Sequence, residues 1–135
     1  MRRYIIAGHG NVASGFVESL NIIIGSFSNL LAINAYVNGH NYGDSYNKAK
    51  EMINRYPEDE FIIMTDLLGG SVNTELMSLQ NERVHIIAGI NLAILLIVLT
   101  SSEEEKTQDL ISRAIKEARE SIIYCNSIDS KDEDF

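Results

Sequence analysis

The sequence is poor in cysteine, proline and tryptophan, with one cysteine, one proline and no tryptophan in 135 residues. The lone cysteine, Cys125, excludes an intrachain disulfide and fits a reducing, cytoplasmic setting. No second cysteine and no spaced pair of histidines accompanies it, so we expect neither a metal nor another cofactor. The hydrophobic fraction of 45% and the charged fraction of 22% are those of an ordinary globular protein.

Positive charge is also scarce, because 11 Lys and Arg stand against 19 Asp and Glu, for a net charge of −8. No basic stripe is visible, so nucleic acid is not an expected partner, and anionic membrane surfaces are disfavoured. The longest apolar run, residues 86–99, is too short to span a bilayer, and the run at residues 4–7 is too short for a signal peptide. We therefore expect a cytoplasmic protein that does not insert into a membrane.

What the sequence does contain is a regular alternation of strand-like and helix-like patterns. This alternation predicts a three-layer, doubly wound α/β fold, with a mostly parallel sheet of order 2-1-3-4 and helices on both faces. The predicted strands are residues 4–7, 30–37, 61–64 and 84–88, and the predicted helices are residues 12–25, 44–56, 69–80, 92–100 and 103–120.

The segment after the last helix allows two interpretations. Residues 122–125 are rich in types that favour β-structure, which predicts a fifth strand at the edge of the sheet. The alternative is that the preceding helix runs on through them. We expect one domain over residues 1–126, followed by an acidic, flexible tail at residues 127–135.

Two chemically suggestive loops follow the first and third predicted strands. In open parallel sheets, ligands bind beyond the carboxyl ends of the strands, where the strand order reverses. With the order 2-1-3-4 this point lies between strands one and three. The loops there are Gly8-His9-Gly10-Asn11 and residues 65–71, which read Thr-Asp-Leu-Leu-Gly-Gly-Ser.

His9 stands between two glycines, so another protein can approach its imidazole. A neutral imidazole is a good nucleophile near neutral pH and can attack phosphorus without a metal. Taken alone, His9 is better interpreted as a loop histidine that caps the next helix. Asp66 follows strand three as His9 follows strand one, and its carboxylate could accept a hydrogen bond from Nδ1 of His9, leaving Nε2 free to react. The alternative for Asp66 is a turn cap.

The residues Gly69, Gly70 and Ser71 open a predicted helix, where backbone N–H groups and a hydroxyl favour a phosphate. An N-cap serine after a flexible turn is the alternative. A rival motif is the dinucleotide fingerprint, which residues 8–13 match, but strand two ends without the carboxylate that would hold a ribose. We assign no catalytic role to the other two histidines. His40 is interpreted as a solvated loop residue near the cleft rim, and His85 as a structural residue.

Together these residues resemble the enzyme IIA domain of the mannose/fructose/sorbose family of the bacterial sugar phosphotransferase system. The matching blocks are residues 5–10 (Ile-Ile-Ala-Gly-His-Gly), residues 65–71 and residues 87–92. After the serine, many members have Pro-Phe-Asn where this chain has Val72-Asn73-Thr74, a change that concerns partner specificity.

The resemblance implies a phosphotransferase with a phosphohistidine intermediate on His9. Asp66 would hydrogen-bond that histidine, and Gly69, Gly70 and Ser71 would surround the phosphoryl group. The implied donor is the phosphocarrier HPr, and the acceptor is an EIIB protein. Residues 122–125 match in position an antiparallel edge strand that family members exchange between the two subunits of a homodimer.

Three alternatives remain open at this point. The first is the related phosphoryl-transfer subunit of dihydroxyacetone kinase systems, which shares the fold and the histidine. The second is a non-catalytic nucleotide- or anion-binding module. The third is a regulatory protein that binds partners according to its phosphorylation state. The transported sugar cannot be read from the sequence, because IIA domains do not touch it.

Overall fold

The computed structural model describes residues 1–128, so most of the predicted acidic tail at 127–135 lies outside the described residues. The chain divides into two compact units, Met1–Leu92 and a second that begins at Ala93. The candidate site lies wholly in the first unit. The prediction of one domain over residues 1–126 stays a prediction.

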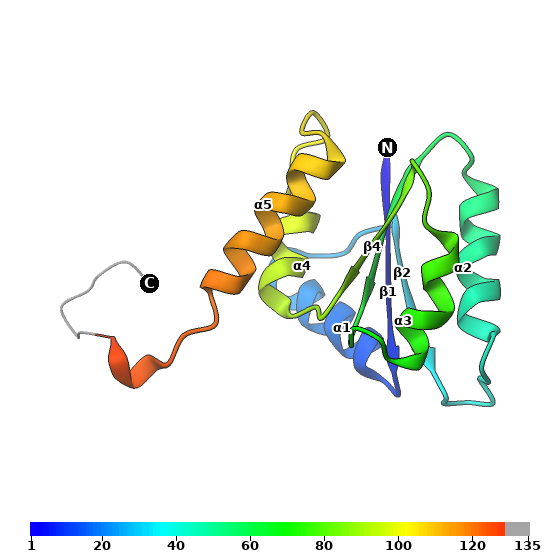
Figure 1. Cartoon of the computed structure of the whole chain (residues 1–135), viewed down its shortest axis with the longest axis horizontal. Coiled ribbons are helices and arrows are strands. Elements are labelled where there is room, and N and C mark those ends of the chain that lie inside the picture. The colour runs from blue at the N-terminus through cyan, green and yellow to red at the C-terminus, as the bar shows by residue number, and fades with distance from the viewer. Residues whose placement is uncertain (129–135) are drawn as a thin grey trace. The chain divides into compact units, whose positions relative to one another are not determined.

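The first unit is a parallel four-stranded sheet with helices on both faces (Figure 1). The strand order is β2-β1-β3-β4, as predicted, which is the order of a flavodoxin-like sheet. Its elements are β1 (Arg2–His9), α1 (Val12–Ile24), β2 (Leu30–Ala35), α2 (Asp44–Arg55), β3 (Glu60–Thr65), α3 (Ser71–Leu76), the 3-10 helix η1 (Met77–Leu79) and β4 (Val84–Ala88).

The register of the sheet brings the functional loops together. Within the β1–β2 pair, His9 lies opposite Ala35, and within the β1–β3 pair, Ala7 lies opposite Thr65. The loops after β1, β2 and β3 therefore leave the sheet at the same edge. Helix α1 lies on one side of the sheet, and α2 and α3 lie on the other (Figure 1).

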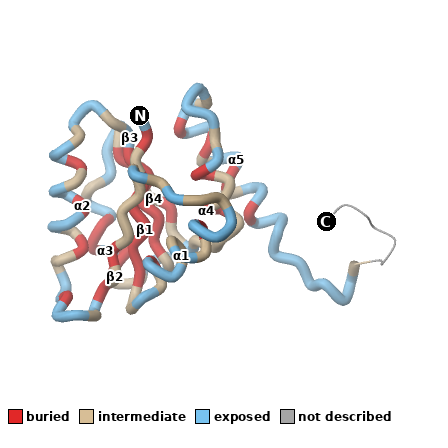
Figure 2. The backbone as a smooth tube through the Cα atoms, turned by 180° about the vertical axis from the view of Figure 1, so that it is seen from behind, coloured by how far each residue is buried: buried red, intermediate tan, exposed pale blue. Residues whose placement is uncertain are grey.

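The two central strands, β1 and β3, are buried on both faces, and the backbone view shows the strands at the buried centre of the unit (Figure 2). Near-continuous apolar runs in β1 and β3 explain this, because a parallel sheet covered on both sides exposes neither face. Alternate strand residues point toward α2 and α3. This half of the core comprises Ile5, Ala7, Ile33, Ala35, Ala49, Ile53, Phe61, Ile63, Val72, Leu76 and Val84.

Two polar side chains hold helix α2 at its ends. The Glu75 carboxylate, from α3, accepts the backbone N–H of Tyr46 at 2.8 Å in the first turn of α2. Arg83 donates to three carbonyl oxygens around the last turn, those of Ile53, Tyr56 and Asp59. Because free N–H and C=O groups at helix ends need partners, these contacts fix α2 relative to α3 and the start of β4.

Two predicted helices are shorter in the structure. The helix predicted to reach residue 80 ends at Leu76 and continues as a 3-10 turn, because Asn81 then turns the chain by accepting the N–H groups of Arg83 and Val84. The helix predicted over residues 103–120 begins at Thr107. Residues 103–105 form a turn instead, in which Ser102 accepts the N–H groups of Glu104 and Glu105.

The second unit contains most of α4 (Leu92–Leu99), together with α5 (Thr107–Glu120) and the 3-10 helix η2 (Cys125–Ser127). Buried residues of α5 recur at helical spacing, at positions 107, 110, 114 and 118. Helix α5 ends at Glu120, so the interpretation that it runs on through residues 122–125 is wrong. Residues 122–124 are neither helix nor strand in the single chain, and Ile122, Ile123 and Tyr124 are exposed. Among residues 1–128, no helix combines the length and hydrophobicity needed to cross a membrane.

Candidate functional site

His9 is the last residue of β1, and Asp66 directly follows β3, its neighbour in the sheet. One carboxylate oxygen, Oδ2 of Asp66, accepts both the backbone N–H of His9 at 2.9 Å and the Nδ1 hydrogen of its ring at 2.9 Å. The other oxygen accepts the backbone N–H of Leu67 at 3.0 Å. The carboxylate therefore fixes both the backbone and the ring of His9. This is the hydrogen bond that the sequence predicts.

Gly8 makes room for this contact. A Cβ atom at Gly8 would lie 2.3 Å from Cγ1 of Val12 and 3.0 Å from Oδ2 of Asp66. The sequence interpretation assigned this glycine to the approach of another protein. The structure gives it a different task, because its missing side chain lets the Asp66 carboxylate reach the backbone of His9.

Asp66 is ionised over the physiological range. Partial burial raises the pKa of its carboxyl group, but the hydrogen bonds from the backbone and ring of His9, the charge of that ring and the N–H of Leu67 together outweigh burial. The net pKa is below the usual value. A carboxylate only accepts hydrogen bonds, so Nδ1 of His9 carries the hydrogen and Nε2 keeps its lone pair when the ring is neutral.

The His9 ring is more exposed than the carboxylate that holds it. The His9 side chain is 41% exposed, whereas the Asp66 side chain is 15% exposed. The hydroxyl oxygen of Ser71 is 3.3 Å from Nε2. Nε2 therefore lies beside a hydroxyl group in a partly exposed side chain, while the other ring nitrogen is held by the less exposed carboxylate.

The side chain of Asn73 stabilises the turn that precedes Ser71. Its side-chain carbonyl accepts the N–H of Gly69 at 3.1 Å, and its amide donates to the Thr65 hydroxyl at 2.9 Å, so this buried residue ties the turn to the end of β3. Gly69 has a φ of +74°, which favours glycine. A Cβ at Gly70 would lie 3.2 Å from Cβ and 3.3 Å from the carbonyl oxygen of Leu67, so this glycine lets the turn close tightly beside the His9 ring.

Tyr36 also belongs to the site, and the sequence interpretation missed it. Its hydroxyl donates to the Ser71 hydroxyl oxygen at 2.8 Å, and its ring centre is 5.7 Å from that of His9. The only signal in the sequence is an aromatic residue at the end of a predicted strand. Tyr36 stands where a dinucleotide-binding protein needs a carboxylate for the ribose, which argues against that rival.

The other two histidines lie away from His9 in the hydrogen-bond network. His40 was interpreted as a solvated loop residue, and this is wrong. It is only 8% exposed, and its Nε2 is 2.9 Å from the Ser45 hydroxyl, because the loop before α2 folds the ring onto the first turn of that helix. His85 alternates within β4, with its Nε2 3.6 Å from a Glu60 carboxylate oxygen, in keeping with its structural interpretation.

Fold and site together define a class of protein: a flavodoxin-like α/β protein with an oriented histidine at the switch point of its sheet. A family model described as the PTS system fructose IIA component (EIIA-man) matches residues 3–115. The PTS system fructose-specific EIIA component of Bacillus subtilis (strain 168) is 29% identical over 125 residues, covering 90% of this chain and 85% of that protein.

Solved structures agree with this match. A putative phosphoenolpyruvate-dependent sugar phosphotransferase system permease from Klebsiella pneumoniae is 36% identical, with a TM-score of 0.83 over 93% of this chain and 92% of that chain. The EIIA component from Streptococcus agalactiae is 25% identical, with a TM-score of 0.79 over 95% of this chain and 100% of that chain. The chain belongs to the mannose-type EIIA family, and it is a phosphotransfer component of a sugar phosphotransferase system.

Proposed function

We propose that this protein accepts a phosphoryl group from phospho-HPr on Nε2 of His9 and passes it to an EIIB protein in the cytoplasm. The observation that carries the proposal is the pair of contacts on the His9 ring. Nδ1 is 2.9 Å from the Asp66 carboxylate, and Nε2 is 3.3 Å from the Ser71 hydroxyl in a side chain that is 41% exposed. One nitrogen is held, and the other is available.

The transfer follows from this arrangement. The lone pair of Nε2 forms a bond to phosphorus as the nitrogen–phosphorus bond of the donor breaks, and the bonding electrons return to the donor nitrogen. The phosphoryl group passes through a loose, metaphosphate-like state. The His9 ring becomes positively charged because Nδ1 keeps its hydrogen, and the Asp66 carboxylate stabilises that charge. Transfer to EIIB is the same step with His9 as the donor.

The loop of residues 69–71 would surround the phosphoryl group. Ser71 and the start of α3 would supply the donors, because the N–H of Gly69 is bound to the Asn73 side chain and that of Gly70 to the Leu67 carbonyl. The Ser71 hydroxyl is the nearest donor to Nε2, and the first backbone N–H groups of a helix have no acceptor within the helix. Because α3 has only six residues, we assign this role to the individual donors and not to a long helix dipole. Catalysis then comes from positioning and from donors that are already oriented.

Labelling with phosphoenolpyruvate, enzyme I and HPr tests the proposal. We expect one phosphoryl group per chain, lost in acid and stable in base, as for a phosphoramidate. Addition of the cognate EIIB should remove it. A label that survives acid would contradict the proposal. So would labelling with HPr that does not exceed the background measured without HPr. Nucleotide binding without labelling would favour the anion-binding module.

We also propose a homodimer in which residues 122–125 of each subunit join the sheet of the other. Ile122, Ile123 and Tyr124 are exposed in the single chain, and β4 ends the sheet with an unpaired edge among the described strands. An exchange within a twofold dimer would cover both features.

Truncation tests the exchange. Deleting residues 121–135 should abolish the dimer or cause aggregation, whereas deleting residues 129–135 should leave a dimer, as measured by analytical ultracentrifugation at micromolar concentration. A full-length monomer, or a dimer that survives the longer deletion, would contradict the exchange.

A further inference from the structure

Tyr36 adopts a backbone conformation that is unfavourable for its residue type. It follows the last residue of β2, and its φ is +66°, in the left-handed region that bulky side chains avoid. Such strain persists only where the surroundings impose it, and it is concentrated at functional sites. The Ala35 carbonyl accepts the N–H of Gly10 at 2.9 Å, so the strained residue leaves β2 directly beside the His9 loop.

The strained backbone directs the Tyr36 phenol over the site and not into the core. The residue is 42% exposed, so burial of its ring does not account for the conformation. The ring is tilted by 41° to the His9 imidazole at a centre-to-centre distance of 5.7 Å, and the hydroxyl reaches Ser71. The contacts that Tyr36 makes here are to two residues of the phosphoryl site.

The Tyr36 hydroxyl also determines where the Ser71 hydrogen points. A serine hydroxyl has one hydrogen to donate, and its oxygen can accept others. Tyr36 donates to the Ser71 oxygen at 2.8 Å, so the Ser71 hydrogen is free for its other neighbour, Nε2 of His9 at 3.3 Å. Four side chains thus form one chain of hydrogen bonds, from Tyr36 through Ser71 and His9 to Asp66.

We propose that Tyr36 is a positioning residue for phosphoryl transfer, which it promotes by orienting the Ser71 hydroxyl toward Nε2 of His9. This inference rests on the proposed function. Once phosphorus is bonded to Nε2, the same Ser71 hydrogen meets a phosphoryl oxygen, and the bond becomes a stronger, charge-assisted one. During transfer the Ser71 oxygen stays held by Tyr36, and its hydrogen turns only from Nε2 to the adjacent phosphoryl oxygen. Tyr36 therefore acts on the transition state more than on donor binding.

The test is a double-mutant cycle of Tyr36→Phe and Ser71→Ala, with single-turnover transfer from phospho-HPr as the readout. Tyr36→Phe keeps the ring and removes only the hydroxyl. We expect it to lower the maximal transfer rate about 5- to 10-fold, the factor that one hydrogen bond in the transition state contributes. Half-saturation by phospho-HPr should change by less than about twofold, since Tyr36 acts on transfer and not on binding.

Ser71→Ala should lower the rate more than Tyr36→Phe does, because it removes the donor itself. The double variant should match Ser71→Ala within about twofold, because Tyr36 has no serine hydroxyl left to orient. Tyr42→Phe is the matched control, since Tyr42 lies in the loop before α2 and is exposed, and we expect wild-type rates from it.

Three results would overturn the inference while leaving the proposed function intact. They are a wild-type transfer rate in Tyr36→Phe, multiplicative effects in the double variant, and an effect confined to half-saturation by phospho-HPr. Failure of the wild-type chain to be labelled on His9 would instead contradict the proposed function. The ¹⁵N chemical shift of Nε2 adds a readout that stability does not move, and we expect it to change in Tyr36→Phe and not in Tyr42→Phe.

Discussion

At each end of strand β1 a nitrogen-bearing side chain is paired with an aspartate, but the two pairs differ in what they can do. At the amino end, Arg3 binds Asp59, which directly precedes β3, and at the carboxyl end, His9 binds Asp66, which directly follows β3. Nε of Arg3 is 2.7 Å from its carboxylate, and Nδ1 of His9 is 2.9 Å from its own. Each pair joins the same two strands, so the difference lies in the side chains and their surroundings.

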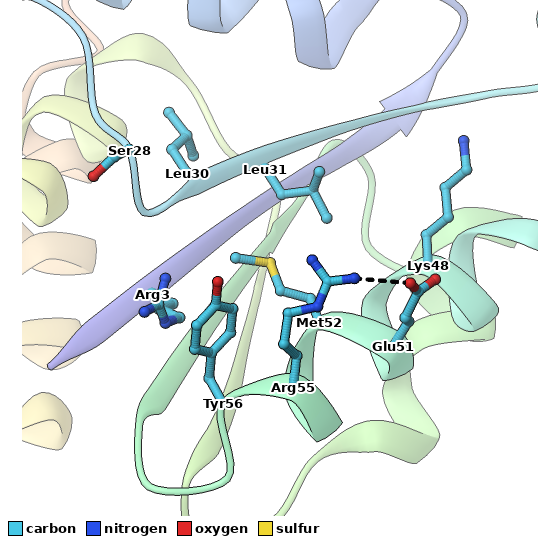
Figure 3. Close-up of a pocket in the computed structure, with 9 residues that line it drawn as sticks. All are labelled: Arg3, Ser28, Leu30, Leu31, Lys48, Glu51, Met52, Arg55 and Tyr56. Carbon is cyan, nitrogen blue, oxygen red and sulfur yellow. Dashed lines mark hydrogen bonds and ion pairs between the residues drawn. The ribbon is translucent and has the colours of Figure 1, made fainter.

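Arg3 is enclosed and permanently charged. Its guanidinium stacks 3.3 Å above the centre of the Tyr56 ring, and its pair with Asp59 neutralises it. A cavity of about 320 Å³ opens beside it, lined also by Lys48, Glu51 and Arg55 (Figure 3). Glu51 binds Arg55 there, so two of the three cations already have carboxylate partners. This end of β1 stabilises the fold and presents no nucleophile.

His9 differs in two respects that decide its chemistry. Its ring has a second nitrogen that keeps a lone pair when the first is held, whereas a guanidinium has none to offer. Its side chain is also more exposed, with the Ser71 hydroxyl beside the free nitrogen. A carboxylate at the end of a strand is therefore not a functional signal by itself. It becomes one when its partner has a free, accessible nucleophilic atom.

Replacing His9 should have the largest effect on phosphoryl labelling, because neither end of β1 would then carry a nucleophile. His9→Gln has no nucleophilic ring nitrogen, so we expect loss of labelling by at least about 10³-fold, which is complete loss in practice. His85→Gln is the matched control and should be labelled normally. Acid-labile label that persists on His9→Gln would place the phosphoryl group elsewhere.

Removing the carboxylate at the functional end should have the next largest effect. Asp66→Ala leaves Nδ1 without its acceptor, so the unproductive tautomer is populated and the charge that forms on the ring is not stabilised. We expect transfer to slow by about 10²- to 10⁴-fold in single-turnover kinetics, with the far-UV circular dichroism unchanged. A rate within about twofold of wild type would remove Asp66 from the mechanism.

Removing the carboxylate at the structural end should have the smallest effect, on stability alone. The hydrogen bond from Arg3 lowers the pKa of Asp59, so the pair contributes stability above the unfolded-state pKa of about 3.9 and loses it as the pH falls through the lower folded-state pKa. Asp59→Asn should therefore melt slightly below wild type at pH 7, and the gap should close in acid.

Phosphoryl transfer by Asp59→Asn should remain within about twofold of the wild-type rate, because the pair lies at the opposite end of β1 from His9. A large loss of transfer, or a stability gap that widens in acid, would show that the two ends do not differ as described.

The sheet and the main pair of the site could be predicted because both follow from local patterns. Apolar runs separated by helical periodicity determine the strand order with few alternatives, and parallel strands bring their carboxyl ends to one edge. His9 and Asp66 each end such a run, so their contact follows from topology alone. The three blocks that resemble a known family point the same way.

Other features depend on contacts that no local pattern records. The positive φ of Tyr36 and its reach to Ser71 arise from how the loop after β2 leaves the sheet. The task of Gly8 is visible only when Asp66 is in place. The burial of His40 likewise depends on how the loop before α2 folds. The common cause is packing between residues that are distant in the sequence, such as Gly8 against Asp66 and Tyr36 against Ser71.

The proposed mechanism is tested most directly by finding which nitrogen of the His9 ring carries the phosphoryl group. Two-dimensional ¹H–¹⁵N spectra of the phosphorylated chain, selectively labelled in histidine, distinguish the two ring nitrogens. Because the Asp66 carboxylate holds Nδ1, we predict phosphorus bonded to Nε2 and a hydrogen retained on Nδ1. Phosphorus on Nδ1 of His9, or on another histidine, would contradict it.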